Sequence, residues 1–175
     1  PLPEAQVDRF MMKVLVGYPQ EDEEFVIVQR VIGQAIEVAA VTSTDQIAQL
    51  QKTCRQGYVD PSLIQFAVKL VSATRHPERF GLADWSRFIT FGASPRATIA
   101  LLEGARALAF LRGRSYALPQ DVIDLVPDVL RHRLVLSYEA LSEGLTPEAI
   151  IAQILQAVPV PDKPLDSHVR TAPTA

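Results

Sequence analysis

The sequence predicts a mainly α-helical domain preceded by one short helix and one short strand. Hydrophobic residues make up 48% of the 175 positions, which is enough apolar surface for a sizeable core. Most of them recur at helical spacing, in segments that open with a capping residue and a proline, as at Asp60-Pro61, Ser94-Pro95 and Thr146-Pro147. One apolar run, at 11–16, has the length and bounds of a strand.

The first 19 residues are expected to form the helix and strand unit. Residues 3–9 have a short helical pattern that ends at Phe10, and the run MMKVLV at 11–16 follows it. Gly17-Tyr18-Pro19 then closes the run, because glycine and proline interrupt regular structure. Acidic residues open a new helical pattern at residue 20, so we place a domain boundary near Pro19.

An all-helical domain is expected over 20–158. Its helices are expected from residue 20 onward and over 45–57, 60–73, 95–112, 118–136 and 146–158. Residues 74–87 are expected to be a loop and 88–91 a short extended piece. Gly113 is the expected cap of the helix before it, and Pro127 is expected to kink or divide its helix. Residues 159–175 contain few apolar anchors and predict a flexible tail.

Composition excludes several classes of function. The net charge of −3 provides no overall positive field for nucleic acid or an anionic membrane, and no apolar run reaches the length of a membrane span. A single cysteine, Cys54, fits a reducing, cytoplasmic setting and is expected to be a small helix residue. His76, His132 and His168 are scattered, so no metal site is predicted. There is no signal peptide, and because the chain opens on Pro1 we expect it to be part of a longer protein.

The stretch GASPRAT at 92–98 combines a helix start with an unexpected cation. Ser94 is a suitable N-cap and Pro95 suits the first helical position. Arg96 then lies next to the positive end of the helix dipole, where a cation costs about 0.3 to 1 kcal/mol. An external phosphate would reverse this cost, because the guanidinium and the backbone N–H groups of the helix start would both bind it.

The segment 75–114 is locally positive in a chain that is acidic overall. It contains three acidic residues and seven arginines: Arg75, Arg79, Arg87, Arg96, Arg106, Arg112 and Arg114. For Arg79, Arg106 and Arg112 we expect a solvated helix face. The alternative is that the segment binds acidic partners or nucleic acid, which would make the chain a stand-alone helical interaction module.

The sequence lacks the pattern of a self-contained enzyme. The phosphate-binding pattern Gly-x-x-x-x-Gly-Lys-Ser/Thr does not occur in it, and no Ser/His/Asp or Cys/His arrangement can be identified. The chain alone is therefore expected to be inactive in nucleotide hydrolysis.

Several motifs, in order, resemble the C-terminal part of a MoxR-family AAA+ ATPase. They are PLPEAQVDRF at 1–10, LVSATR at 70–75, GASPRA at 92–97, ALAFLRGR at 107–114, LPQDV at 118–122 and LRHRL at 130–134. The resemblance extends over 1–161. It implies that 1–19 is the last helix and strand of an α/β ATPase core and that 20–158 is the helical lid.

The resemblance also implies roles for two arginines. Arg96 matches the second sensor, which reaches the terminal phosphate of bound ATP, with Ser94 and Pro95 beside it. Arg9 matches the finger that reaches the nucleotide of a neighbouring subunit, and such arginines stabilise the charge that develops on a transferring phosphoryl group. The alternative for Arg9 is a structural ion pair with Asp8 or Glu4.

For the full-length protein the resemblance implies ATP and Mg²⁺ as cofactors and a hexameric ring. It implies chaperone-like work in the cytoplasm, on partners that often contain von Willebrand factor A domains. The reading frame upstream of Pro1 would distinguish an ATPase from the interaction module. The client protein, the pathway, the oligomeric state of this chain and the state of the upstream core do not follow from the sequence.

Overall fold

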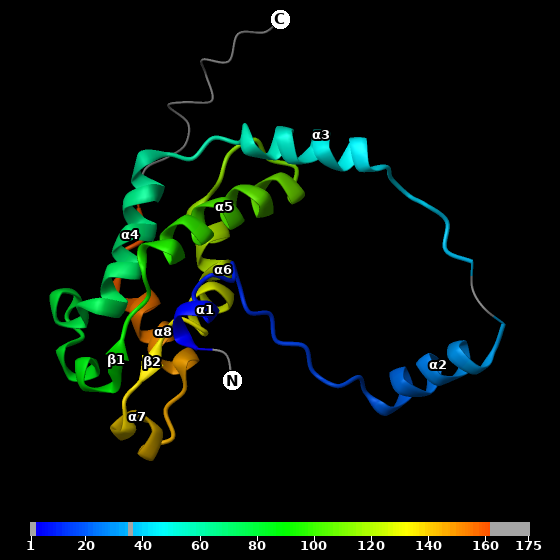
Figure 1. Cartoon of the computed structure of the whole chain (residues 1–175). Helices are drawn as coiled ribbons and strands as arrows, with labels where there is room; N and C mark the ends of the chain where they lie inside the picture. Colours follow the sequence, from blue (N-terminus) through cyan, green and yellow to red (C-terminus); the bar gives the residue numbers. More distant parts are fainter. Residues whose placement is uncertain (1–2, 35–36, 162–175) are drawn as a thin grey trace, which may run out of the picture.

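The computed structural model describes residues 3–34 and 37–161, which form a helical body with one long excursion near the N-terminus (Figure 1). The helices are α1 (Glu4–Val7), α2 (Glu21–Ile32), α3 (Thr44–Arg55), α4 (Pro61–Arg75), α5 (Pro95–Leu111), α6 (Pro119–Leu130), α7 (Tyr138–Ser142) and α8 (Pro147–Ala157). The 3₁₀ helices η1 (Pro77–Phe80) and η2 (Ala83–Phe88) and the strands β1 (Ile89–Phe91) and β2 (Val135–Leu136) complete the set. The prediction of a mainly helical fold is confirmed.

The core lies between α4, α5, α6 and α8. Its fully buried side chains come from all four helices and include Leu70, Leu101, Val122 and Ile150. Burying one such side chain stabilises the fold by about 1.5 to 3 kcal/mol. The apolar spacing that predicted these helices therefore also predicted their buried faces.

Three of these helices begin as the sequence predicts, with a cap followed by proline. Asp60 accepts a hydrogen bond from the N–H of Ser62 at 2.8 Å, and Thr146 accepts one from the N–H of Ala149 at 3.3 Å. Ser94 caps α5 in the same way. Each cap satisfies a backbone donor that the helix leaves unpaired, an effect of about 1 kcal/mol.

A two-stranded antiparallel sheet joins the end of η2 to the residues that follow α6. Ile89 lies opposite Leu136, and Phe91 lies opposite Val135. The expected helix over 118–136 is therefore too long, because α6 ends at Leu130 and residues 135 and 136 pair with β1. The helix continues through Pro127 and ends three residues later, and α7 was not predicted.

The expected strand at 11–16 does not form. Residues 11–20 have no regular secondary structure, and Val14 and Val16 are 61% and 89% exposed. A strand requires a neighbouring strand to accept and donate its backbone hydrogen bonds. Among the described residues no strand lies beside this run, and its backbone instead bonds to α6, where the N–H of Lys13 donates to the carbonyl of Asp128 at 2.8 Å.

Helix α2 stands apart from the helical body in Figure 1, and none of its residues is buried. Its first turn contains four acidic residues, Glu21 to Glu24, as the helix dipole favours. Helix α3 also lacks buried residues but lies against α5. The division into 1–19, 20–158 and 159–175 stays a prediction, and residues 162–175 of the expected tail lie outside the described residues.

Candidate functional site

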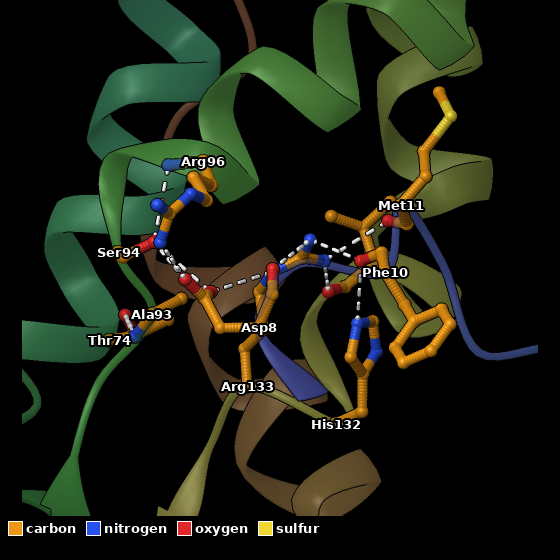
Figure 2. Close-up of polar contacts among 10 residues, drawn as sticks. Asp8, Phe10, Met11, Thr74, Ala93, Ser94, Arg96, His132 and Arg133 are labelled. Carbon is orange, nitrogen blue, oxygen red and sulfur yellow. Dashed lines mark hydrogen bonds and ion pairs between the residues drawn. The ribbon is translucent and has the colours of Figure 1, made fainter. Parts of the chain in front are cut away.

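The start of α5 is fixed against the end of α4. The side chain of Thr74 donates to the carbonyl of Val71 at 2.7 Å and accepts from the N–H of Ala93 at 2.9 Å. A Cβ atom at Gly92 would collide with the carbonyl of Thr74, so only glycine allows this approach. The GASPRA stretch is thereby held on the LVSATR stretch through the bond between Thr74 and Ala93 (Figure 2).

The backbone N–H groups of this first turn already have acceptors. The N–H of Arg96 donates to the side chain of Ser94 at 3.2 Å, and the N–H of Ala97 donates to the carbonyl of Ser94 at 2.9 Å. Pro95 has no N–H to offer. The expectation that these groups join in binding an anion is therefore not supported, and the guanidinium of Arg96 is the group left to do so.

An anionic group does lie at this helix start, and it belongs to the protein. The carboxylate of Asp8 accepts from Nη1 of Arg96 at 3.1 Å and from the hydroxyl of Ser94 at 2.9 and 3.1 Å. The Arg96 side chain is 60% exposed and that of Asp8 is 18% exposed. The cation in the first turn of α5 is thus compensated by a carboxylate from the segment that follows α1.

A second arginine, Arg133, reaches the same carboxylate from the opposite side (Figure 2). Its Nε donates to Asp8 Oδ1 at 3.1 Å, and its side chain is 2% exposed. The remaining guanidinium hydrogens bind the backbone carbonyls of Asp8, Phe10, Met11 and Val129. We call Asp8, Ser94, Arg96 and Arg133 the Asp8 cluster.

The Asp8 cluster is electrostatically balanced in favour of an ionised carboxylate. Burial alone would raise the pKa of Asp8, but the hydrogen bonds from Arg96, Ser94 and Arg133 outweigh it and hold that pKa below its ordinary value. Arg133 remains charged at neutral pH, since an arginine in a protein does not lose its proton. One carboxylate therefore faces two guanidinium groups, of which the exposed one, Arg96, is the more easily released.

Arg9 follows Asp8 in the chain, but none of the bonds within this cluster involves its side chain. It is exposed, and no ion pair joins it to any carboxylate whose side chain the structure describes. The structural alternative of a pair with Asp8 is wrong, because Asp8 binds Arg96 and Arg133 instead. The side chain of Glu4, the other candidate partner, lies outside the description.

The histidine next to Arg133 contributes to the same contact. Nε2 of His132 lies 3.1 Å from the carbonyl of Phe10, so we assign the proton to this nitrogen. Nδ1 is buried without a hydrogen-bond partner. Burial lowers the pKa of His132, because an imidazolium at this place would lose its hydration.

A second set of ion pairs joins the end of α5 to α6. Arg114 donates to both carboxylate oxygens of Asp121, at 2.6 and 2.8 Å, and Asp121 is fully buried. Arg112 binds Asp121 at 2.7 Å and Asp124 at 2.6 Å. Burial would raise the pKa of Asp121, but hydrogen bonds, the largest from Arg114, hold that pKa below its ordinary value.

The expectation of a solvated face holds for two of the three arginines. Arg112 has a side chain that is 41% exposed, as expected, although it also forms an ion pair with the buried Asp121. Arg106 is half-buried and donates to the carbonyl of Arg55 at 3.3 Å. Arg79 is exposed, as expected. Most of the local positive charge therefore serves internal structure, which leaves less of it for an acidic partner.

Within residues 3–34 and 37–161, no group of histidine, cysteine or carboxylate side chains could hold a metal ion. His168 lies outside the described residues. In the same ranges, no helix has both the length and the apolar character needed to cross a bilayer.

The site residues that sequence reasoning missed are Asp8 and Arg133. Both occur in motifs that carried the resemblance, Asp-Arg-Phe at 8–10 and LRHRL at 130–134, but Asp8 was considered only as a partner of Arg9 and Arg133 was given no role. The structure brings together Asp8, Ser94 and Arg96 with Arg133, and it leaves Arg9 exposed on the same segment.

The chain is similar to a described protein family and to several known proteins. The family described as "AAA lid domain" matches residues 85–154. The chain is 45% identical over 161 residues to "Chaperone MoxR1" of Mycobacterium tuberculosis, covering 92% of this chain and 43% of that protein. It is 34% identical to "Protein MoxR" of Paracoccus denitrificans, covering 91% of this chain and 51% of that protein.

A solved structure has the same fold. It is described as a putative ATPase from Cytophaga hutchinsonii, and it matches with a TM-score of 0.88 and 37% sequence identity. The match covers 93% of this chain and 50% of that chain. The present chain thus spans about half the length of the relatives that it matches.

Proposed function

We propose that the chain is the AAA lid region of a MoxR-type AAA+ ATPase and that it supplies two arginines to ATP hydrolysis. Arg96 would act on the nucleotide bound by the same subunit. Arg9 would act on the nucleotide of a neighbouring subunit. The positive segment on which the alternative of a stand-alone interaction module rested is largely used within the chain, because Arg87, Arg96, Arg112 and Arg114 all form ion pairs there.

The observation that carries the proposal is that the guanidinium of Arg96 is exposed and weakly held. Its guanidinium is exposed and joined to the body by one ion pair, with a carboxylate that keeps two other donors. A terminal phosphate with more negative charge than a carboxylate would compete for this arginine at little structural cost. Ser94 and Pro95 would contribute by setting the position of the first turn of α5, because the side chain of Ser94 is already used within the protein.

Arg9 suits action on another molecule. An exposed guanidinium that is not held by a described carboxylate is available to a partner's phosphate, and the segment on which it lies is fixed to the lid. Placing a preorganised cation where charge develops in the transition state can contribute several orders of magnitude in rate.

The described residues could bind the terminal phosphate of ATP, but they offer no group of ligands for the Mg²⁺ ion that accompanies it. Arg96 is a suitable phosphate ligand, whereas the described part of the chain offers no cluster of carboxylates for Mg²⁺. We therefore assign Mg²⁺ and the phosphate loop to the remainder of the full-length protein. Bound Mg²⁺ would neutralise charge on the transferring phosphoryl group.

We extend the proposal to the oligomeric state of the full-length protein and to its action on partner proteins. An arginine that acts on a neighbour's nucleotide requires a ring, for which we propose six subunits. The name "Chaperone MoxR1" of one relative supports chaperone-like remodelling of partner proteins. By the family resemblance, we propose partners with von Willebrand factor A domains and a cytoplasmic location.

The test uses Arg9→Ala and Arg96→Ala in the full-length protein. We expect both variants to lose ATP turnover, and Arg9→Ala to keep nucleotide affinity because its target belongs to another subunit. Mixing each variant with wild-type subunits then separates the roles. Arg9→Ala subunits should abolish ATP hydrolysis in the neighbouring subunit. Arg96→Ala subunits should lose only their own ATP hydrolysis.

Normal turnover in Arg96→Ala would contradict the role of Arg96. If Arg9→Ala subunits in mixed rings lost only their own hydrolysis, Arg9 would act within its own subunit and the ring assignment would be wrong. Arg87→Ala serves as the control, because Arg87 is equally exposed and pairs with Glu139 away from the Asp8 cluster.

A further inference from the structure

The segment 8–13 forms no regular element beyond the end of α1. Its amide groups make three hydrogen bonds: Arg9 to Gln6, Phe10 to Val7 and Lys13 to Asp128. The first two continue the turn that closes α1. The third reaches α6, so the segment depends on the lid for its position.

The lid holds this segment mainly through one side chain. Nη2 of Arg133 donates to the carbonyl of Asp8 at 3.1 Å and to the carbonyl of Phe10 at 2.6 Å. Nη1 donates to the carbonyl of Met11 at 3.1 Å, and the Nε of Arg133 binds the Asp8 side chain. A single buried guanidinium therefore binds the peptide groups on both sides of Arg9.

Neighbouring lid residues strengthen this contact at single points. Nε2 of His132 lies 3.1 Å from the carbonyl of Phe10, and Nη1 of Arg131 lies 3.1 Å from the carbonyl of Lys13. None of the hydrogen bonds or ion pairs of these three described side chains involves the Arg9 side chain. The arrangement fixes the backbone from which Arg9 projects and leaves its guanidinium exposed.

We propose that Arg133 is a positioning residue for Arg9. This inference rests on the proposed role of Arg9 and extends it to a residue with no assigned role. A finger arginine acts on a phosphate in another subunit, so small errors in the backbone that carries it reduce the rate strongly. Arg133 is suited to prevent such errors, because its planar group binds several carbonyls in one fixed geometry.

Substitution by lysine separates this role from simple charge pairing. Arg133→Lys keeps a cation near Asp8 but cannot bind the carbonyls of Asp8, Phe10 and Met11 together. Arg114→Lys is the matched control, because Arg114 also binds a carboxylate and a backbone carbonyl but lies within the α5 and α6 contact. A second, milder variant is His132→Phe, which removes one bond to Phe10 and keeps the ring.

The first measurement is amide hydrogen exchange in the full 175-residue chain. In Arg133→Lys we expect exchange at Arg9, Phe10 and Lys13 to accelerate at least tenfold, with α5 changed much less. His132→Phe should show a smaller acceleration at the same amides. Arg114→Lys should leave them unchanged. Equal acceleration across the whole lid, or none at the three amides, overturns the proposal.

The second measurement is ATP turnover of the full-length protein. Arg133→Lys should lower turnover by 10- to 100-fold with nucleotide affinity retained, and the same change made in Arg9→Ala should cause little further loss. Accelerated exchange at the three amides with normal turnover overturns the positioning role. If Arg9→Ala alone leaves turnover intact, the proposed function of Arg9 fails, whereas the exchange data still decide whether Arg133 holds the segment.

Discussion

Removing Arg96 and removing Asp8 should have very different effects on the stability of the 175-residue chain. In Arg96→Ala an exposed ion pair is lost, which costs about 0.2 to 1 kcal/mol. The same change removes a cation from the positive end of α5, which returns about 0.3 to 1 kcal/mol. The two effects are similar in size and opposite in sign, so we expect a net change within about 1 kcal/mol of zero.

Asp8→Ala should be costly because it leaves a buried cation behind. Arg133 is 2% exposed, and removing one partner of a buried pair typically costs about 3 to 5 kcal/mol. Asp8 is itself 18% exposed, and Arg133 keeps its bonds to backbone carbonyls, which reduces this cost. We expect a loss of about 2 to 3 kcal/mol.

Urea unfolding followed by circular dichroism measures both changes, with Arg87→Ala as a control for an exposed, ion-paired arginine elsewhere in the lid. A loss above about 2 kcal/mol in Arg96→Ala would show that Arg96 is a structural residue and would refute its easy release to a phosphate. Equal effects of Arg96→Ala and Asp8→Ala would refute the assignment of Arg133 as the dominant partner of Asp8.

Three further outcomes are expected. The 175-residue chain should show no ATP turnover above a contaminant control, since it lacks the phosphate-binding pattern; turnover that follows the purified chain would count against this. Because burial lowers the pKa of His132 in the folded state, its contribution to stability should be fully present above about pH 6.5 and should be lost as the pH falls below that value; in urea titrations His132→Gln should flatten this fall, and an unchanged fall would contradict the assignment. Gly92→Ala should lower stability by about 1 to 3 kcal/mol through its collision with Thr74, while Gly17→Ala, with open space around it, should have no effect; a neutral Gly92→Ala refutes the close approach.

The features that the sequence predicted correctly are local in the chain. Asp60, Ser94 and Thr146 each cap a helix by binding an N–H two or three residues away, so the sequence around them contains both partners. The same holds for Gly113, whose φ of +74° follows from its place just after α5. Periodicity over a dozen residues likewise predicts which helix face is buried.

The Asp8 cluster could not be predicted in this way. Asp8 binds Arg96 and Arg133, which follow it by 88 and 125 residues, and no local pattern indicates which acid meets which arginine. The buried Asp121 was missed for a related reason. A carboxylate in a helix start looks like a solvated capping residue until the arginines that neutralise it are placed.

The incorrect predictions concern segments whose structure depends on a distant partner. The apolar run at 11–16 has the composition of a strand, but a strand forms only beside another one. Residues 135 and 136 fit a helical pattern, yet they pair with β1, nearly 50 residues earlier in the chain. In both cases the propensity of the segment was outweighed by whether the fold supplied a hydrogen-bonding neighbour.

The shared carboxylate limits how strongly the two arginines can be coupled. If a phosphate removed Arg96 from Asp8, the carboxylate would bind Arg133 and Ser94 alone, and any effect on the segment of Arg9 would arise from that change. Such coupling cannot exceed the free energy of the broken contact, which for an exposed pair is about 0.2 to 1 kcal/mol. That range corresponds to a factor of about 1.4 to 5 in an equilibrium constant. A larger effect of ATP on Arg9 would therefore require movement of the whole lid, which would carry Arg133 and the segment that it holds together.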